Sequence, residues 1–529
     1  MRTFETSSTV VKFFLFMSIC LSAACASYKS SNSGDWLIEN AQLIDGTGSA
    51  AITADVRFAN QRIVAIGQLN ARPSERVIDA TGLVLAPGFI DTHSHADSDL
   101  DEHPYATAAT SQGITTAVFG QDGESALPLK STLDHWESSP AAVNVASYSG
   151  HNSLRHQVMG DDFKRPATAG EVEAMKILLQ SDLQAGALGL ATGLEYDPGI
   201  YSDTTEIIEL ARVTSTAGGR YISHIRSEDR YFETAIEEII TIGREAQLPV
   251  QISHLKLAMT TLWGKTPWLL ARLDKARAEG VDITADVYPY EYWQSTLEVL
   301  FPERNFSDLN TAREILNTLA PADGLLMSEY LAEPDLVGKT IADIAQARNI
   351  SAEQALINVL ADAQRYTAEH QLDDGSIISS ESVIATSMRK EDIAELILWR
   401  HSNICTDGGL IDRHPRAIGS FPRVLRWLVR EEKRLSLEEA IHKMTLQAAE
   451  NIGIKQRGVI EAGAFADLVL FNPSTVSDLA TPQQPHLQSI GIEKVWVNGD
   501  VVFQNGKSTN SLPGQVIRRA SSEHGETVE

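Results

Sequence analysis

The stretch Pro87-Gly-Phe-Ile-Asp-Thr-His93-Ser-His95 decides the fold class of this chain. It reads as a short apolar strand that ends in a His-x-His pair. Because residues two apart in a strand point to the same side, His93 and His95 are expected to project together from the strand end. Neutral imidazoles bind Zn²⁺ and similar ions, so the pair is a candidate metal site. Such a pair also arises by coincidence, and the rest of the chain has to support it.

Further short apolar segments follow, separated by amphipathic helical stretches, which is the pattern of parallel βαβ units. Together with residues 88–93 they give the eight strands that a (β/α)8 barrel needs. The interval at about 291–380 is far longer than an ordinary loop, and we expect an inserted helical lid or small subdomain there, before the last strand. The further segments are residues 114–120, 143–148, 187–192, 221–225, 250–255, 282–288 and 404–407.

Both ends of the chain are rich in expected β-structure. Residues 35–85 and 455–512 alternate apolar and polar side chains, with Asp-Gly and Ala-Thr-Gly turns in the first of them. We therefore expect an α/β fold in which a barrel at 86–454 carries one small β-sandwich domain built from both ends of the chain.

The first 26 residues are expected to be a signal peptide. An apolar run at 13–24 follows Arg2 and Lys12, and it is short for a membrane span. Two processing routes remain open: Ser22-Ala-Ala-Cys25 resembles a lipobox, which would attach the protein to a membrane through lipidated Cys25, whereas 24–26 is also a small-x-small cleavage site. We expect an exported protein, in the periplasm or as an outer-membrane lipoprotein of a bacterium.

Charge and cysteine content argue against a nucleic-acid-binding protein and against a protein stabilised by disulfides. The formal net charge of −26 and the lack of a Lys/Arg stripe argue against a nucleic-acid partner. Outside the signal segment the only cysteine is Cys405, so no structural disulfide is expected.

Three more polar residues stand at predicted strand ends. His224 follows the fifth strand, His254 the sixth and Asp407 the eighth. A single histidine at such a place is often a hydrogen-bonded filler. Four histidines and an aspartate on four strand ends, all at the functional face of a barrel, indicate a metal-dependent active site.

From about 35 to 512 the chain resembles the amidohydrolase superfamily, specifically the N-acyl-D-amino-acid deacylases (D-aminoacylases). The resemblance implies metal-dependent hydrolysis of an amide bond, with N-acyl-D-amino acids as small-molecule substrates and one or two Zn²⁺, or another divalent ion, as cofactor. The motifs that carry it are residues 86–97, 112–116, 189–193, 201–202, 224–228, 252–256, 286–290, 406–408, 414–416, 444–445, 457–458 and 463–471.

The resemblance also implies roles for matching positions. His224 and His254 would hold the tighter metal, and His93 and His95 would face a weaker second one. Asp407 would bind metal and act as general base and then general acid.

Other matching positions are implied to bind the substrate. Lys256, Tyr288 and Arg416 resemble residues that grip the free carboxylate. Tyr196 is a candidate near the leaving side, and His151 either orients the substrate or simply packs. For Lys256 and Arg416 a structural salt bridge remains the alternative.

One position departs from the family pattern. The family usually carries Asn-Cys-Gly at the end of strand two, with the cysteine as a metal ligand, whereas this chain has Gln121-Asp122-Gly123-Glu124. We expect Asp122 to bind metal and to bridge two ions, with Glu124 as the fallback ligand. A loop aspartate that binds no metal is the remaining possibility.

Two other functions stay open. A cyclic amidase or a dipeptidase of the same superfamily would typically use a carboxylated lysine, which the strand-four end Leu190-Ala-Thr-Gly-Leu194 lacks, although Asp122 could supply the bridging anion. A non-catalytic exported binding lipoprotein would be expected to have lost ligands, and none of the five strand-end candidates is missing. An exported deacylase would suit the scavenging of N-acylated D-amino acids.

Overall fold

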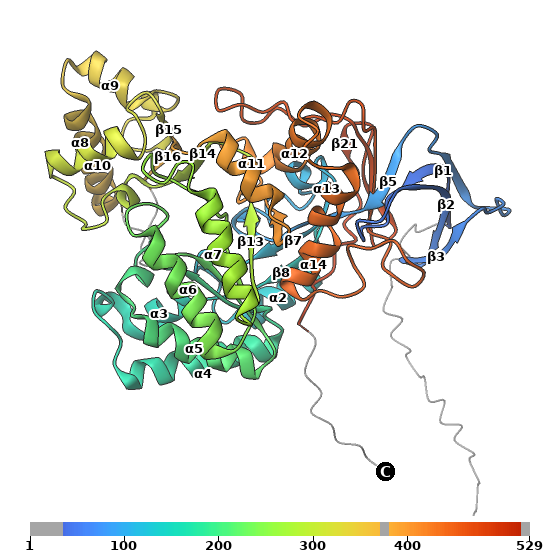
Figure 1. The fold of residues 1–529 in the computed structure, drawn as a ribbon, viewed down its shortest axis with the longest axis horizontal. Coiled ribbons are helices and arrows are strands. Elements are labelled where there is room, and N and C mark those ends of the chain that lie inside the picture. The colour runs from blue at the N-terminus through green and yellow to red at the C-terminus, as the bar shows by residue number, and fades with distance from the viewer. Residues whose placement is uncertain (1–34, 371–379, 520–529) are drawn as a thin grey trace, which may run out of the picture. The chain divides into compact units, whose positions relative to one another are not determined.

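The structure of the protein, a computed structural model, describes residues 35–370 and 380–519. Its fold is mixed α/β (Figure 1). Seven of the eight segments expected to be barrel strands hold most of a parallel strand, whereas the last, 404–407, shares only Ile404 with β17 (Ser402–Ile404). The strands lie in two parallel ladders, β6-β7-β8 and β9-β10-β11-β12-β13-β17. Their bounds are β6 (Phe89–Asp91), β7 (Ile114–Phe119), β8 (Asn144–Ser147), β9 (Ser149–Gly150), β10 (Gly189–Gly193), β11 (Arg220–His224), β12 (Val250–Ile252), β13 (Ile283–Val287) and β17 (Ser402–Ile404).

Backbone hydrogen bonds connect the two ladders at both of their edges. On one side only Tyr148 separates β8 from β9, and the Leu188 N–H, just before β10, donates to the Ser147 carbonyl of β8 at 2.9 Å. On the other side the Asp407 N–H donates to the His93 carbonyl at 2.9 Å, and the His95 N–H donates to the Gly408 carbonyl at 3.0 Å. The segment after β17 is thereby held against the end of β6, where the expected metal ligands lie.

Helices follow the strands, as the βαβ pattern predicts. In α6, apolar residues recur at helical spacing from Phe232 through Ile236 to Ile240, and all three are buried. A capping box formed by Thr168 and Glu171 begins α4. The helices outside the insertion are α1 (Thr107–Thr110), α2 (Leu129–Ser138), α3 (His151–Met159), α4 (Ala169–Ala185), α5 (Thr204–Thr216), α6 (Phe232–Ala246), α7 (Thr266–Ala278), α11 (Lys390–Leu398), α12 (Arg416–Val424), α13 (Leu437–Met444) and α14 (Leu446–Ile452).

Strands from both chain ends form one nine-stranded sheet, in the order β21-β20-β19-β18-β5-β1-β2-β3 with β4 on β1. Trp36 and Phe58 from the N-terminal part pack with their rings against Trp496 of the C-terminal part, at centroid distances of 5.8 Å each. The strands are β1 (Trp36–Leu43), β2 (Ile52–Ala59), β3 (Arg62–Gly67), β4 (Arg76–Asp79), β5 (Val84–Pro87), β18 (Leu468–Phe471), β19 (Ile492–Val497), β20 (Asp500–Gln504) and β21 (Lys507–Ser508).

Gly88 is the junction through which the chain passes from this sheet into β6. A Cβ atom at Gly88 would lie 2.2 Å from a methyl carbon of Thr115, closer than any real contact. Glycine is therefore required here by close approach rather than by an unusual φ.

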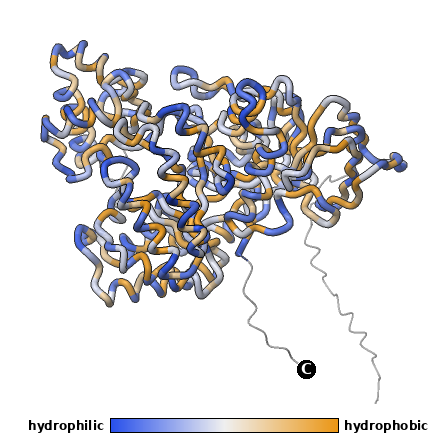
Figure 2. Tube along the Cα trace, viewed as in Figure 1, coloured by the Kyte–Doolittle hydropathy of each residue, from blue (hydrophilic) through white to orange (hydrophobic). Residues whose placement is uncertain are grey.

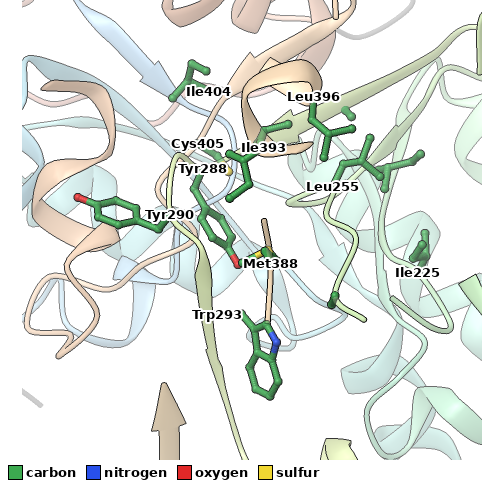
Figure 3. Packing of buried hydrophobic residues seen from close by; sticks show 14 of the residues in the cluster. Ile225, Leu255, Tyr288, Tyr290, Trp293, Met388, Ile393, Leu396, Ile404 and Cys405 are labelled. Atoms are coloured by element: carbon green, nitrogen blue, oxygen red, sulfur yellow. The ribbon is translucent and has the colours of Figure 1, made fainter. Parts of the chain in front are cut away.

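The insertion contains the expected helices and also a three-stranded antiparallel sheet, ordered β14-β16-β15. The sheet was not expected, because its strands are short and lie far apart along the chain. Trp293 of β14 donates through Nε1 to the Ser387 hydroxyl at 2.6 Å, and with Met388 and Tyr288 it belongs to the large buried cluster (Figure 3). The elements are β14 (Tyr292–Ser295), α8 (Leu309–Thr318), β15 (Leu325–Tyr330), α9 (Ile341–Arg348), α10 (Ala352–Glu369) and β16 (Glu381–Thr386).

Apolar and polar residues alternate throughout the described chain (Figure 2). Within 35–370 and 380–519, no helix is long and apolar enough to cross a membrane. The expected signal segment and Cys25 lie outside the described residues.

Candidate metal centre

Three overlapping groups of possible ligands lie at the carboxyl ends of the barrel strands; two of them share Asp122, and the third consists of Glu195, His224 and Glu228. The first brings together His93, His95, Asp122 and Asp407. The Nε2 atoms of His93 and His95 are 3.3 Å apart, and the Asp407 Oδ1 atom lies 3.5 and 3.3 Å from them. The Asp122 carboxylate lies 3.5 Å from the Nε2 of His93 and 3.4 Å from that of His95.

The second cluster consists of Asp122, His224 and His254. His224 faces it through Nδ1 and His254 through Nε2, and these two atoms are 3.1 Å apart. Asp122 Oδ1 lies 3.4 Å from the His254 nitrogen, and Oδ2 lies 4.0 Å from the His224 nitrogen. Asp122 is therefore the residue that the two clusters share.

The spacing of these atoms suits tetrahedral zinc. Two ligands at about 2.0–2.1 Å from one zinc ion are about 3.3–3.4 Å apart in a tetrahedron, close to most of the separations in both clusters. The Asp122 Oδ1 atom is also buried without a hydrogen-bond partner among the described residues. A buried, unsatisfied carboxylate oxygen amid imidazole nitrogens is the environment that a cation would complete.

Three further carboxylates contact His224 and His254 through atoms that do not face Asp122. The outer nitrogen of His224 lies 2.9 Å from Glu195 Oε2, and that of His254 lies 3.0 Å from Glu228 Oε1. Asp286 accepts a hydrogen bond from the His254 backbone N–H at 2.6 Å. Such contacts fix the orientation of a ligating imidazole.

The sequence interpretation assigned no role to these three carboxylates. Asp286 could have been found, because it is the polar residue near the end of an apolar strand. Glu195 and Glu228 lie on loops, and only the loop conformation brings them to histidines on other strands.

Asp407 is paired with Arg416, whose Nη1 donates to Asp407 Oδ2. Both side chains are buried. Burial alone would raise the pKa of Asp407, but the Arg416 guanidinium and the His254 ring hold that pKa well below its usual range. Asp407 is therefore an ionised carboxylate, as a general base must be.

Lys256 is held in a buried ion pair. Its Nζ lies 2.6 Å from both carboxylate oxygens of Glu228, and its side chain is 4% exposed. The salt bridge that was the alternative for Lys256 is thus present, and the residue also lines the cavity described below. The lysine also lies 5.8 Å from the centre of the Tyr288 ring.

Tyr288 and Tyr196 flank the centre from two sides. The Arg416 guanidinium lies 4.9 Å from the centre of the Tyr288 ring, and the Tyr288 hydroxyl is buried without a partner within the described ranges. The ring of Tyr196 lies 4.5 Å from that of His224, and burial raises the pKa of Tyr196 well above its usual value.

The centre opens into a cavity of about 580 Å³. Barrel residues form its floor, among them Asp122, His254 and Arg416. The insertion supplies another wall, which sequence reasoning did not anticipate, through Trp293, Gln294, Ser295, Thr296, Val299, Leu300, Leu319, Glu329, Glu381 and Ser382.

Two further candidates, His151 and Glu124, lie outside the ligand clusters. His151 begins α3 and does not line this cavity; its Nε2 lies 2.8 Å from Glu206 Oε1, which is consistent with packing and not with orienting a substrate. Glu124 lines the cavity but belongs to neither cluster, and it accepts a hydrogen bond from the Ser153 hydroxyl at 3.0 Å.

Comparison with known proteins identifies the family. The sequence pattern of the Amidohydrolase family matches residues 76–371 and 401–503. This chain belongs to that family. The resemblance stated from the motifs is thereby confirmed at the level of the family.

Similar proteins are found over nearly the whole length. The N-acyl-D-glutamate deacylase of Alcaligenes xylosoxydans xylosoxydans is 35% identical over 92% of this chain and 97% of its own. The D-aminoacylase of the same organism is 33% identical over 92% of this chain and 98% of its own. The crystal structure of N-acyl-D-glutamate deacylase from Bordetella bronchiseptica, complexed with zinc and a phosphonate inhibitor, superposes with a TM-score of 0.81 at 34% identity, over 92% and 99% of the two chains.

Proposed function

We propose that this amidohydrolase is a zinc-dependent deacylase, which hydrolyses N-acyl-D-amino acids to a carboxylate and a free D-amino acid. The observation that carries the proposal is the position of Asp122, shared by two ligand clusters, with the ionised Asp407 beside both histidines of the first. Relatives that cover nearly the full chain are deacylases of this kind, and one of their structures holds zinc.

His93, His95, Asp122, His224, His254 and Asp407 would hold one or two zinc ions. Zinc bound there would lower the pKa of a water molecule and polarise the amide carbonyl. Because Asp122 belongs to both clusters, we propose that it would be a ligand shared by two ions, at the position where the resembling family carries a cysteine ligand.

The remaining steps belong to protein side chains. Asp407 accepts the proton of the attacking water and delivers it to the leaving nitrogen. Arg416 lines the cavity and would hold the substrate carboxylate, with the Tyr288 ring beside its guanidinium. Tyr196 lies over His224, at the edge of the same cavity, where it would help to exclude water.

The test is a matched panel of N-acetyl-D- and N-acetyl-L-amino acids given to zinc-loaded protein, with released amine and bound zinc both measured. We expect turnover of D forms only. Asp407→Asn is the control variant, and it should lose turnover while the four histidines and Asp122 still retain zinc. If zinc-loaded protein hydrolyses neither series, the proposal is wrong, and dipeptides and cyclic amides become the substrates to try.

We also propose that the protein is exported through residues 1–26, with Cys25 as a lipidation site. The support is the sequence pattern alone. Mass spectrometry of the mature amino terminus tests it: a diacylglyceryl Cys25 is expected, and an intact Met1 or an unmodified terminus at Ser27 contradicts the lipoprotein assignment.

A further inference from the structure

The cavity offers cations for one carboxylate group and no more. Lys256 and Arg416 are its lysine and arginine residues within the described chain, and Lys256 is neutralised by Glu228. Arg416 is paired with Asp407 through Nη1 and is the cation left for the α-carboxylate. An acidic substrate side chain would bring a second carboxylate, for which the described residues of this cavity supply no unpaired lysine or arginine.

The insertion side of the cavity carries carboxylates instead. Glu329 of β15 lies opposite Ser382 of β16 in the strand register. Gln294 donates from Nε2 to the Ser382 hydroxyl at 3.1 Å and to Asp412 Oδ1 at 3.2 Å. These contacts make a continuous wall, with Glu329 at one end and Asp412 at the other. Among the described residues no lysine or arginine forms a salt bridge with either carboxylate, although Asp412 is close enough to Arg416 to help raise the pKa of that arginine.

The same wall separates the cavity from a second one of about 570 Å³, and Gln294, Glu329 and Asp412 line both. Two oxygen atoms along this path lack partners in the part of the chain that the structure describes. One is the buried Oε1 of Gln294; the other is the hydroxyl of Ser328, a residue 3% exposed that lines the second cavity. Unsatisfied buried oxygens next to carboxylates call for a ligand that donates hydrogen bonds.

Other charged groups near Glu329 and Asp412 do not make this side of the cavity positive. Burial raises the pKa of Glu381 to about 8, so its carboxyl group is largely uncharged at neutral pH. The exposed Arg413 and His486 line the second cavity but not the first. A side chain that leaves the metal centre thus passes Glu329 and Asp412 before it reaches Arg413.

We infer that this site takes N-acyl-D-amino acids with a long cationic side chain, of the lysine or arginine type, and discriminates against acidic side chains. The inference rests on the deacylase function proposed above. The ammonium or guanidinium group lies against the cavity wall that carries Glu329, Gln294 and Asp412, while Arg416 holds the α-carboxylate. The inferred preference for cationic side chains differs from the acidic substrate in the name of the relative N-acyl-D-glutamate deacylase.

The experiment compares kcat/KM for N-acetyl derivatives of D-lysine, D-arginine, D-methionine, D-glutamine and D-glutamate. The D-glutamine and D-glutamate pair has nearly the same shape and differs in charge. We expect the lysine and arginine derivatives to exceed the methionine derivative by about fivefold, the effect of one partly exposed ion pair. The glutamate derivative should fall at least about tenfold below glutamine, and 0.5 M NaCl should reduce both differences.

Glu329→Gln removes the wall charge with little change of shape, and Glu102→Gln, an exposed glutamate that lines neither cavity, is the matched control. The first should lower the lysine-to-methionine ratio about threefold to fivefold, and the second should leave it unchanged. If the methionine derivative is hydrolysed but the lysine derivative is no better, or the glutamate derivative is preferred, the inference is wrong and the deacylase function stands. If zinc-loaded protein hydrolyses no D substrate, both fail.

Discussion

Replacement of Lys256 by methionine tests whether this lysine holds the site together or binds substrate. At 2.6 Å from Glu228, with both side chains nearly buried, an effective dielectric constant of about 20 gives a gross attraction of about 6 kcal/mol. The desolvation of the two charges offsets much of that attraction. Removing one partner leaves the other charge buried and unpaired, so the free energy of unfolding should fall by about 3–5 kcal/mol.

The substitution should also weaken metal binding through His254. Glu228 Oε1 also contacts His254 Nδ1 at 3.0 Å, and disturbed contacts of this kind typically lower metal affinity about 10–100-fold. The assays are urea denaturation, with and without zinc, and zinc competition against a fluorescent chelator. A substrate-binding lysine would instead raise KM and leave stability and zinc affinity unchanged.

A double-mutant cycle with Glu228→Gln separates the pair from its surroundings. The double variant leaves no unpaired charge, so it should be more stable than the sum of the single losses predicts, by about 2 kcal/mol or more. The reasoning is refuted if the losses are additive, or if the free energy of unfolding of the Lys256→Met protein lies within about 0.5 kcal/mol of that of the parent. Lys256 would then be assigned to substrate binding.

Further changes test the ligand set and the insertion. Asp286→Asn keeps an acceptor for the His254 N–H but removes a buried charge, so zinc affinity measured by chelator competition should fall about 10–100-fold; unchanged affinity would contradict its positioning role. Asp122→Ala should reduce bound zinc, measured by mass spectrometry, from two ions per chain to one or none, and two retained ions would rule out the bridge. Burial raises the pKa of Glu381 to about 8 in the folded protein. Its protonated carboxyl group therefore contributes to folding stability below the pKa of the unfolded chain, and this contribution is lost as the pH rises through 8. Glu381→Gln should therefore raise Tm at pH 9 and leave it unchanged at pH 5; equal effects at both would refute the assignment.

The strand-end residues could be predicted because two simple regularities place them. Side chains alternate along a strand, and parallel barrel strands end at one face. His93, His95 and His254 follow from these rules alone. The position of Asp122 followed only from the family resemblance, since a Gln-Asp-Gly turn by itself indicates no ligand.

The same regularities fail where the backbone is irregular. β9 has only two residues, and α3 begins directly after it at His151. That histidine therefore contacts Glu206 of α5 and not the cavity. The cavity wall from the insertion was also beyond prediction, since strand pairing between segments some ninety residues apart along the chain leaves no local pattern.

The backbone at the metal centre links the fold to the chemistry. Asp122, His254 and Asp407 have φ angles of 52°, 35° and 52°, in the left-handed region that costs most side chains energy. For two of them the structure shows what maintains the conformation. The Asp407 N–H is bonded to the His93 carbonyl, and the His254 N–H is bonded to the Asp286 carboxylate. Each left-handed residue turns the chain sharply just after a strand, which redirects its side chain from the barrel wall towards the shared centre. Because those bonds join segments that follow different strands, the arrangement of the strand ends and the assembly of the metal centre depend on the same contacts.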